Sequence, residues 1–122
     1  MYNNNIEFSQ LKGKIITGIS GAFYNSYEII FKCSDNAEYK MYHEQDCCEN
    51  VTVDEIIGDI EHLLNSEILQ AEEVSQDDPN AMESGTWTFY KLATIKGYIT
   101  IKWYGSSNGY YSESVSFCKI SA

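Results

Sequence analysis

The chain lacks arginine altogether, and its eight lysines stand against eighteen acidic residues, which gives a formal net charge of −10. The imbalance is concentrated between Glu38 and Glu83, where fourteen acidic residues accompany a single lysine. Such a surface repels the phosphates of nucleic acids, so we expect no direct binding to DNA or RNA. Two interpretations of the acidic region stay open: a solvated surface, or a surface that docks on a basic partner.

Long hydrophobic runs are also missing, since no apolar run approaches the roughly 18 residues of a membrane-spanning helix. The opening MYNNNIEFSQLKGK has neither the basic region nor the apolar block of a secretory signal. We therefore expect a cytoplasmic protein that does not enter a membrane. In that compartment Cys33, Cys47, Cys48 and Cys118 should remain free thiols, and a bridge between the adjacent pair would strain the peptide that joins them.

Proline is nearly absent, whereas ten tyrosines, five phenylalanines and two tryptophans favour strands over helices. Short alternating or apolar runs bounded by turn residues predict strands at 14–19, 27–33, 38–43, 67–74, 86–94, 98–104 and 110–120. In the run 98–104 we expect Ile99, Ile101 and Trp103 to point inward. The segment 75–85 is polar and rich in turn residues, which predicts a loop.

One segment carries the spacing of a helix. Apolar residues recur at one helical face over 52–64, and Thr52 with Glu55 forms a capping box at its start. The sequence therefore predicts an α+β fold in a single domain over residues 1–122. We expect a strongly twisted, mostly antiparallel sheet of six or seven strands, with this one helix packed on it.

The stretch MYHEQDCCEN (41–50) has the density of polar groups expected of a site. A metal site is disfavoured, because the adjacent Cys47 and Cys48 point apart and no second cluster supplies further ligands. A nucleophilic thiol is disfavoured, because Asp46 and Glu49 would raise the pKa of a neighbouring cysteine. Asp46, Glu49 and Glu113 could supply a pair of carboxylates for acid–base catalysis. Acidic residues are so common in this chain that such a pair is weak evidence of a catalytic site. The bland alternative is a turn in which Cys48 is buried and polar side chains satisfy the backbone.

The stretch KWYGSSNGYYSE (102–113) places small polar residues between aromatic ones, and Gly105 and Gly109 allow close backbone approach. This pattern suits a planar, hydrogen-bonding ligand, a protein interface, or simple cross-strand aromatic pairing around a turn. We assign no catalytic residue, no metal and no cofactor. The candidate ligand-binding residues are His43, Gln45, Asp46, Cys47, Glu49, Lys102, Trp103, Tyr104, Ser107, Asn108, Tyr110, Tyr111 and Glu113.

The motifs YHEQDCCE and WYGSSNGYYSE, with TWTFYKLATIKG between them, resemble an uncharacterised family of small proteins of bacteriophages and prophages of Gram-positive bacteria. The resemblance covers residues from about 38 to 118. It implies a small accessory phage protein that acts in the host cytosol, and proteins of that kind often counter host defences. It implies no catalytic residues.

Three functions follow from these observations. The first is a sponge that sequesters a cyclic nucleotide or a cyclic ADP-ribose derivative without chemistry, as a homo-oligomer. The lack of arginine leaves the phosphates to Lys102, His43, backbone amides and tyrosine hydroxyls. The second is an acidic inhibitor, of the anti-CRISPR type, that binds a basic host nuclease effector. The third is an enzyme that cleaves a nucleotide signal. We expect the first.

Overall fold

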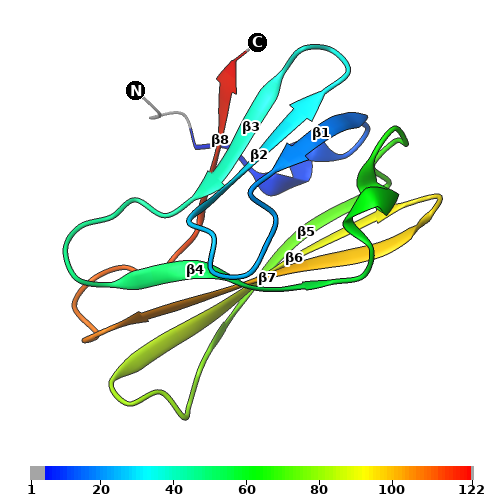
Figure 1. Ribbon diagram of the computed structural model, residues 1–122. Helices are drawn as coiled ribbons and strands as arrows, with labels where there is room; N and C mark the ends of the chain where they lie inside the picture. The colour runs from blue at the N-terminus through cyan, green and yellow to red at the C-terminus, as the bar shows by residue number, and fades with distance from the viewer. Residues whose placement is uncertain (1–4, 122) are drawn as a thin grey trace.

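The computed structural model describes residues 5–121, and strands make up most of it. The elements in chain order are η1 (Phe8–Leu11), β1 (Ile16–Ser20), β2 (Glu28–Cys33), β3 (Glu38–Tyr42), β4 (Asn50–Ile57), η2 (Ile60–Leu63), β5 (Gln70–Asp77), β6 (Ser84–Thr94), β7 (Gly97–Ser107) and β8 (Ser116–Ser121). They form two antiparallel four-stranded sheets, ordered β1-β2-β3-β8 and β4-β7-β6-β5 (Figure 1). The arrangement is a β-sandwich, with the two sheets facing each other.

The predicted α+β fold is wrong, because the segment expected to be a helix is strand β4 followed by the single 3₁₀ turn η2. Val51, Thr52 and Val53 are β-branched and favour an extended backbone. They pair with β7, which lies some fifty residues further along the chain. Gly58, at φ +102°, ends the strand in a conformation that suits glycine. Pairing with the distant strand β7 therefore outweighs the helical spacing of the apolar residues, and the local sequence does not reveal that partner.

The strand predictions elsewhere are confirmed, with shifted ends. Strand β7 buries Ile99, Ile101 and Trp103 as expected, at 1%, 0% and 0% exposure. The strand expected at 67–74 begins at Gln70 instead, and the last strand begins at Ser116 rather than at residue 110.

One hydrophobic cluster joins the two sheets. The Trp103 indole N–H of the second sheet donates to the Met41 sulfur of the first, 3.0 Å away. Phe117 on β8 stacks on Tyr39 and meets Phe8 of η1 edge-on, with ring centroids 5.5 and 5.2 Å apart. Part of the aromatic excess thus fills the space between the sheets, whereas other aromatic residues are exposed. Neither described helix is long and apolar enough to cross a membrane.

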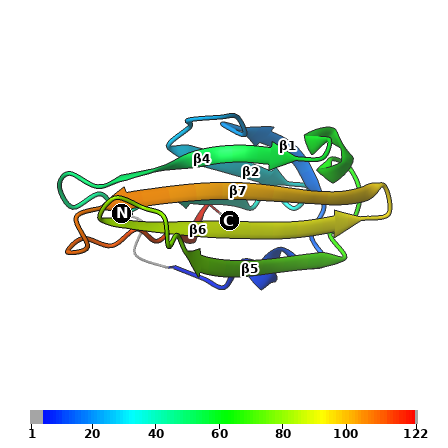
Figure 2. The same cartoon turned by 90° about the horizontal axis from the view of Figure 1, so that it is seen from below.

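Three loops project from the same end of the second sheet, as both ribbon views show (Figures 1 and 2). They are loop 43–49 between β3 and β4, loop 78–83 between β5 and β6, and loop 108–115 between β7 and β8. The first and third carry the two motif stretches, which the fold therefore brings together.

Candidate functional site

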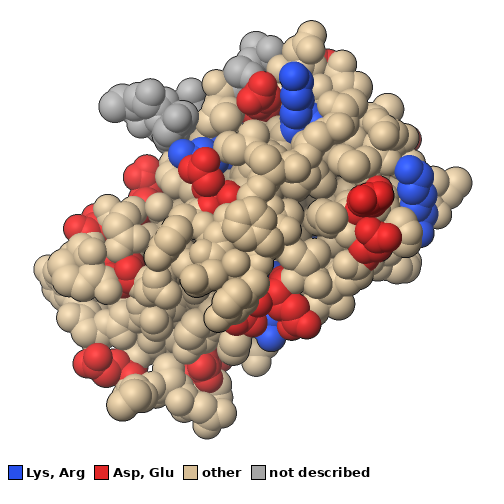
Figure 3. Space-filling model, viewed as in Figure 1, with Lys and Arg blue, Asp and Glu red and all other residues tan. Residues whose placement is uncertain are grey.

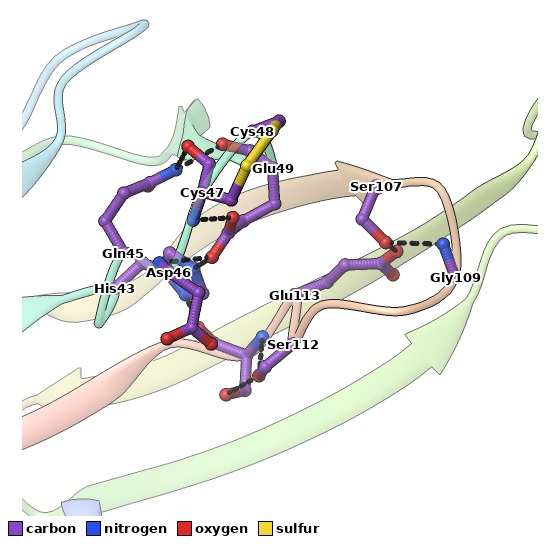
Figure 4. Close-up of polar contacts among 11 residues, drawn as sticks. His43, Gln45, Asp46, Cys47, Cys48, Glu49, Ser107, Gly109, Ser112 and Glu113 are labelled. Atoms are coloured by element: carbon purple, nitrogen blue, oxygen red, sulfur yellow. Dashed lines mark hydrogen bonds and ion pairs between the residues drawn. A yellow bond between two sulfur atoms is a disulfide. The ribbon is translucent and has the colours of Figure 1, made fainter.

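Loop 43–49 is organised around the carboxylate of Glu49, whose side chain is fully buried. One carboxylate oxygen accepts from His43 Nε2 at 2.8 Å and from the Asp46 amide at 2.8 Å, and the other accepts from the Cys47 amide at 2.9 Å (Figure 4). The Gln45 amide nitrogen donates to the carbonyls of Cys47 and Glu49. Five of the predicted site residues therefore hold the loop in shape: His43, Gln45, Asp46, Cys47 and Glu49.

The donors around Glu49 keep it charged. Burial alone would raise the pKa of this carboxyl, but His43 and the amides of Asp46 and Cys47 outweigh it and lower the pKa to about 2. The group is a carboxylate at every pH near neutrality. It can accept hydrogen bonds but cannot act as a general acid there.

His43 links the two motif loops. Its Nε2 contacts Glu49, and its Nδ1 lies 2.6 Å from the carbonyl oxygen of Ser114 in loop 108–115. Both partners are hydrogen-bond acceptors, so the His43 ring connects the Glu49 carboxylate of its own loop to the backbone of loop 108–115.

Loop 108–115 is organised around a second buried carboxylate, Glu113, which is 8% exposed. Thr86 donates to one of its oxygens at 2.7 Å. Ser107 donates to the other, and the Ser107 hydroxyl accepts from the Gly109 amide (Figure 4). Burial would raise the pKa of Glu113, but hydrogen bonds from Ser107, Thr86 and Ser84 lower it below its usual value. Each motif thus contains one buried glutamate that fixes its loop.

Gly105 allows loop 108–115 to lie against β7. A Cβ at this position would come within 2.6 Å of the Glu113 carbonyl oxygen and 2.9 Å of its Cβ. No real Cβ fits there, so the glycine of the second motif is required by packing.

A cleft of about 520 Å³ lies between the three loops and the end of β7. The motif stretches supply Cys48, Glu49, Tyr104, Ser106, Ser107, Asn108 and Tyr111 to its lining, and loop 78–83 with the start of β6 supplies Ala81, Met82, Glu83 and Ser84. Its volume is in the range of small-molecule sites. We call it the loop cleft.

A second hollow, of about 460 Å³, lies on the other side of loop 43–49. It is lined by Tyr27, Glu28, Lys40, Tyr42, His43, Gln45, Glu49 and Asn50. Lys40 is already engaged by Glu28 at 3.3 Å and lies over the Tyr42 ring. This hollow therefore offers a ligand no uncommitted cation.

The candidate residues fall into separate places. Glu49, Tyr104, Ser107, Asn108 and Tyr111 line the loop cleft together. His43 and Gln45 line the second hollow.

The other candidates lie elsewhere. Trp103 is in the core and closed to a surface ligand. Lys102 lies on the outer face of the second sheet, 4.3 Å above the Trp87 ring and within 4 Å of Asp54. Asp46, Cys47 and Tyr110 are exposed, and Glu113 is an internal anchor.

The expectation of four free thiols is wrong for one pair. Cys47 and Cys48 are joined by a disulfide, whereas Cys33 and Cys118 are free and buried. Cys48, expected to be buried, is exposed at the edge of the loop cleft. Its loop projects into solvent beyond the sheet, where no core is available to cover it. Among residues 5–121, no group of three or more His, Cys, Asp or Glu could hold a metal ion.

Sequence reasoning missed the contribution of loop 78–83. The Tyr104 hydroxyl donates to Asp78 at 2.7 Å, which raises the pKa of Tyr104 to about 12 and fixes the ring against the loop. Gly85 makes room for this ring, since a Cβ there would lie 2.2 Å from the Tyr104 oxygen. The only available signal was the polar, turn-rich composition of 75–85.

A family model described as a domain of unknown function, DUF7448, matches residues 9–117. The chain belongs to this family. The DUF7448 match spans both motif stretches and nearly the whole sandwich, so the expected kinship with an uncharacterised family is confirmed at that level. The bacteriophage origin stays a prediction. No curated protein and no solved structure matches the chain.

Proposed function

We propose that this DUF7448 protein captures a nucleotide-type small molecule in the loop cleft and performs no chemistry on it. The proposal rests on one observation: some motif residues hold the loops in place, and others line the hollow between them. His43, Glu49 and Glu113 fix two loops, and the hollow between these loops is lined by rings, hydroxyls and an amide. Such a lining suits recognition.

The cleft has the groups that recognise a nucleobase and a ribose. Tyr104 and Tyr111 offer flat rings with polar tips for stacking on a base. The Asn108 amide carries both a donor and an acceptor for the edge of the base. Ser106 and the exposed carboxylate of Glu83 suit the hydroxyls of a sugar.

The charge of the cleft determines the orientation in which a nucleotide would bind. Among the described residues that line it there is no lysine, arginine or histidine, and Glu83 would repel a phosphate at close range. Recognition therefore rests on the base and the sugar, with the phosphates directed to solvent. A nucleoside and its nucleotide should bind with similar affinity.

The buried carboxylates support binding without catalysis. A general acid that works near neutral pH needs a raised pKa, whereas the pKa of Glu49 and that of Glu113 are both lowered. Each carboxylate also has its oxygens engaged by hydrogen-bond donors of the protein, which come from loop 43–49 for Glu49 and from β6 and β7 for Glu113. Neither can therefore donate a proton to a ligand near neutral pH.

The setting of the proposal is phage counter-defence, in which the protein sequesters a nucleotide immune signal, such as a cyclic nucleotide or a cyclic ADP-ribose derivative, in the host cytosol. The support is the resemblance of the two motif stretches to small phage proteins. We include assembly into a homo-oligomer in this proposal.

The test is titration calorimetry with adenosine, AMP and cyclic ADP-ribose against the protein and matched variants. Tyr111→Ala should weaken binding of a ligand of this class at least about tenfold through loss of ring stacking. The control, Tyr98→Ala, removes a tyrosine that is 79% exposed at the other end of β7, away from the loop cleft, and should change nothing. Equal losses in both variants, or affinity that depends chiefly on the number of phosphates, would refute the proposal.

A further inference from the structure

Sheet edges expose unpaired backbone groups, and in this molecule three of the four edges carry a covering segment. At β8, the Ile6 amide donates to the Phe117 carbonyl at 2.9 Å. At β1, the Asn65 amide donates to the Ile16 carbonyl at 2.7 Å. At β4, Val53 exchanges two backbone hydrogen bonds with residues 25–26.

The edge formed by β5 is the exception. Within residues 5–121, β5 pairs with β6 alone, and no backbone hydrogen bond from another segment reaches it. Every residue from Glu72 to Asp77 is exposed. The helix η1 lies beside β5 (Figure 2) and sends Phe8 and Leu11 into the core, but leaves these residues open.

The register shows which backbone groups face outward. The Asp78 amide donates to the Gly85 carbonyl, which continues the β5–β6 register as a hydrogen-bonded pair. Hydrogen-bonded and non-hydrogen-bonded pairs alternate in an antiparallel ladder. The amides and carbonyls of Glu73, Ser75 and Asp77 therefore point away from β6, toward the free edge.

The charge at this edge selects the kind of strand that could pair with it. β5 carries Glu72, Glu73 and Asp77 and no basic residue, and Asp78 follows directly. Partial burial and the neighbouring Glu7 raise the pKa of Glu73, as expected where like charges lie close together. On the face drawn in Figure 3, acidic side chains are likewise widespread and basic ones few. Two copies of β5 would repel each other, whereas a basic strand would be attracted.

We propose that the β5 edge, from Glu73 to Asp77, binds an extended lysine- or arginine-rich segment of a partner protein as a fifth strand of the sheet. The outward amides and carbonyls supply the backbone pairing, and the acidic side chains supply the preference for a basic sequence. This surface is separate from the loop cleft, so the protein can hold a small ligand and a protein partner at once.

The test uses a blocked eight-residue peptide of alternating lysine and threonine, with the glutamate–threonine peptide as its control. The lysine peptide should slow hydrogen exchange at the amides of Glu73, Ser75 and Asp77, and added salt should weaken its binding. The glutamate peptide should not bind. Absence of binding by the lysine peptide, equal binding of both peptides, or protection confined to other residues would overturn the proposal.

Variants separate the backbone contribution from the charge. Ser75→Pro removes an outward N–H without breaking a bond to β6 and should raise the dissociation constant at least about fivefold, whereas Ser75→Ala keeps the N–H and should bind normally. Asp77→Asn keeps the backbone and should weaken binding through charge alone, which preserves the test if Ser75→Pro fails to fold. Unchanged affinity in Asp77→Asn and in a folded Ser75→Pro would contradict binding of the peptide at the β5 edge. Self-association through β5 would contradict it as well.

Discussion

Glu49 is the residue on which loop 43–49 depends, because its carboxylate gathers one side chain and two backbone amides. His43 then carries the connection across to Ser114. Buried charges of this kind are held by complete hydrogen bonding, and removing one partner leaves the other unsatisfied. The shape of the loop cleft therefore rests on a few polar contacts within one of its walls.

The Glu49→Gln variant should be less stable than the native protein at neutral pH, and the difference should depend on pH. The pKa of Glu49 is lowered from an ordinary value near 4.5 to about 2 in the folded protein. Its stabilising contribution is therefore fully present above pH 4.5 and is lost as the pH falls toward 2. Urea unfolding at several pH values should show the two proteins converging in acid. A gap that is constant from neutral pH down to 2 would contradict the stabilisation of the charged Glu49 carboxylate by its hydrogen bonds.

At this scale the sequence indicated which residue types matter but not what they contact. His43 and Ser114 are 71 positions apart, and Thr86 and Glu113 are 27 apart. Such contacts exist only once both sheets have formed. From the sequence, the polar groups of the motif HEQDCCE suggested direct contacts with a ligand. In the structure most of them form hydrogen bonds with one another.

At the scale of elements, β4 shows why local spacing failed. The spacing of its apolar residues fits one face of a helix as well as one face of a strand. Hydrogen bonding to β7 selects the strand. The hairpin of β6 and β7 was predictable because a long alternating pattern and a short turn agreed. The ends of the strands were less predictable, because terminal residues continue a strand only where a neighbouring strand pairs with them.

Two substitutions in β4 distinguish the strand from the predicted helix. Val53→Thr places a hydroxyl at a fully buried position and should cost about 1–3 kcal/mol of unfolding free energy. Ile57→Thr changes a side chain that is 47% exposed and should cost less than about 0.5 kcal/mol. Chemical denaturation measures both. A loss at Ile57 as large as the loss at Val53 would favour the helical arrangement, in which both positions face the core.

Gly105→Ala tests the packing of loop 108–115 on β7. The added methyl would collide with the backbone of Glu113, so we expect a loss of about 1–3 kcal/mol in unfolding free energy. Gly18→Ala is the control, because its Cβ would meet only the Lys32 side chain, at 3.9 Å. Thermal unfolding of the two variants gives the comparison. Equal stability of both would show that the loop does not lie against β7 as closely as described.

At the scale of the whole molecule, the fold separates two surfaces of different character. The loop cleft stands at one end of the second sheet and is built from both motifs, while the acidic β5 edge runs along one side of the same sheet. Composition alone predicted the acidity, but only the topology shows that β5 is a free edge. Membership of the DUF7448 family joins the motifs to one fold without assigning an activity.

The most direct test of the loop cleft is native mass spectrometry of the protein incubated with cyclic nucleotides, ADP-ribose and cyclic ADP-ribose. Capture without chemistry predicts an intact ligand bound at a fixed number per subunit, retained in Tyr98→Ala and lost in Tyr111→Ala. The same spectrum gives the number of subunits. Cleaved ligand would show an enzyme instead, and a protein that binds none of these compounds would contradict nucleotide capture in the cleft.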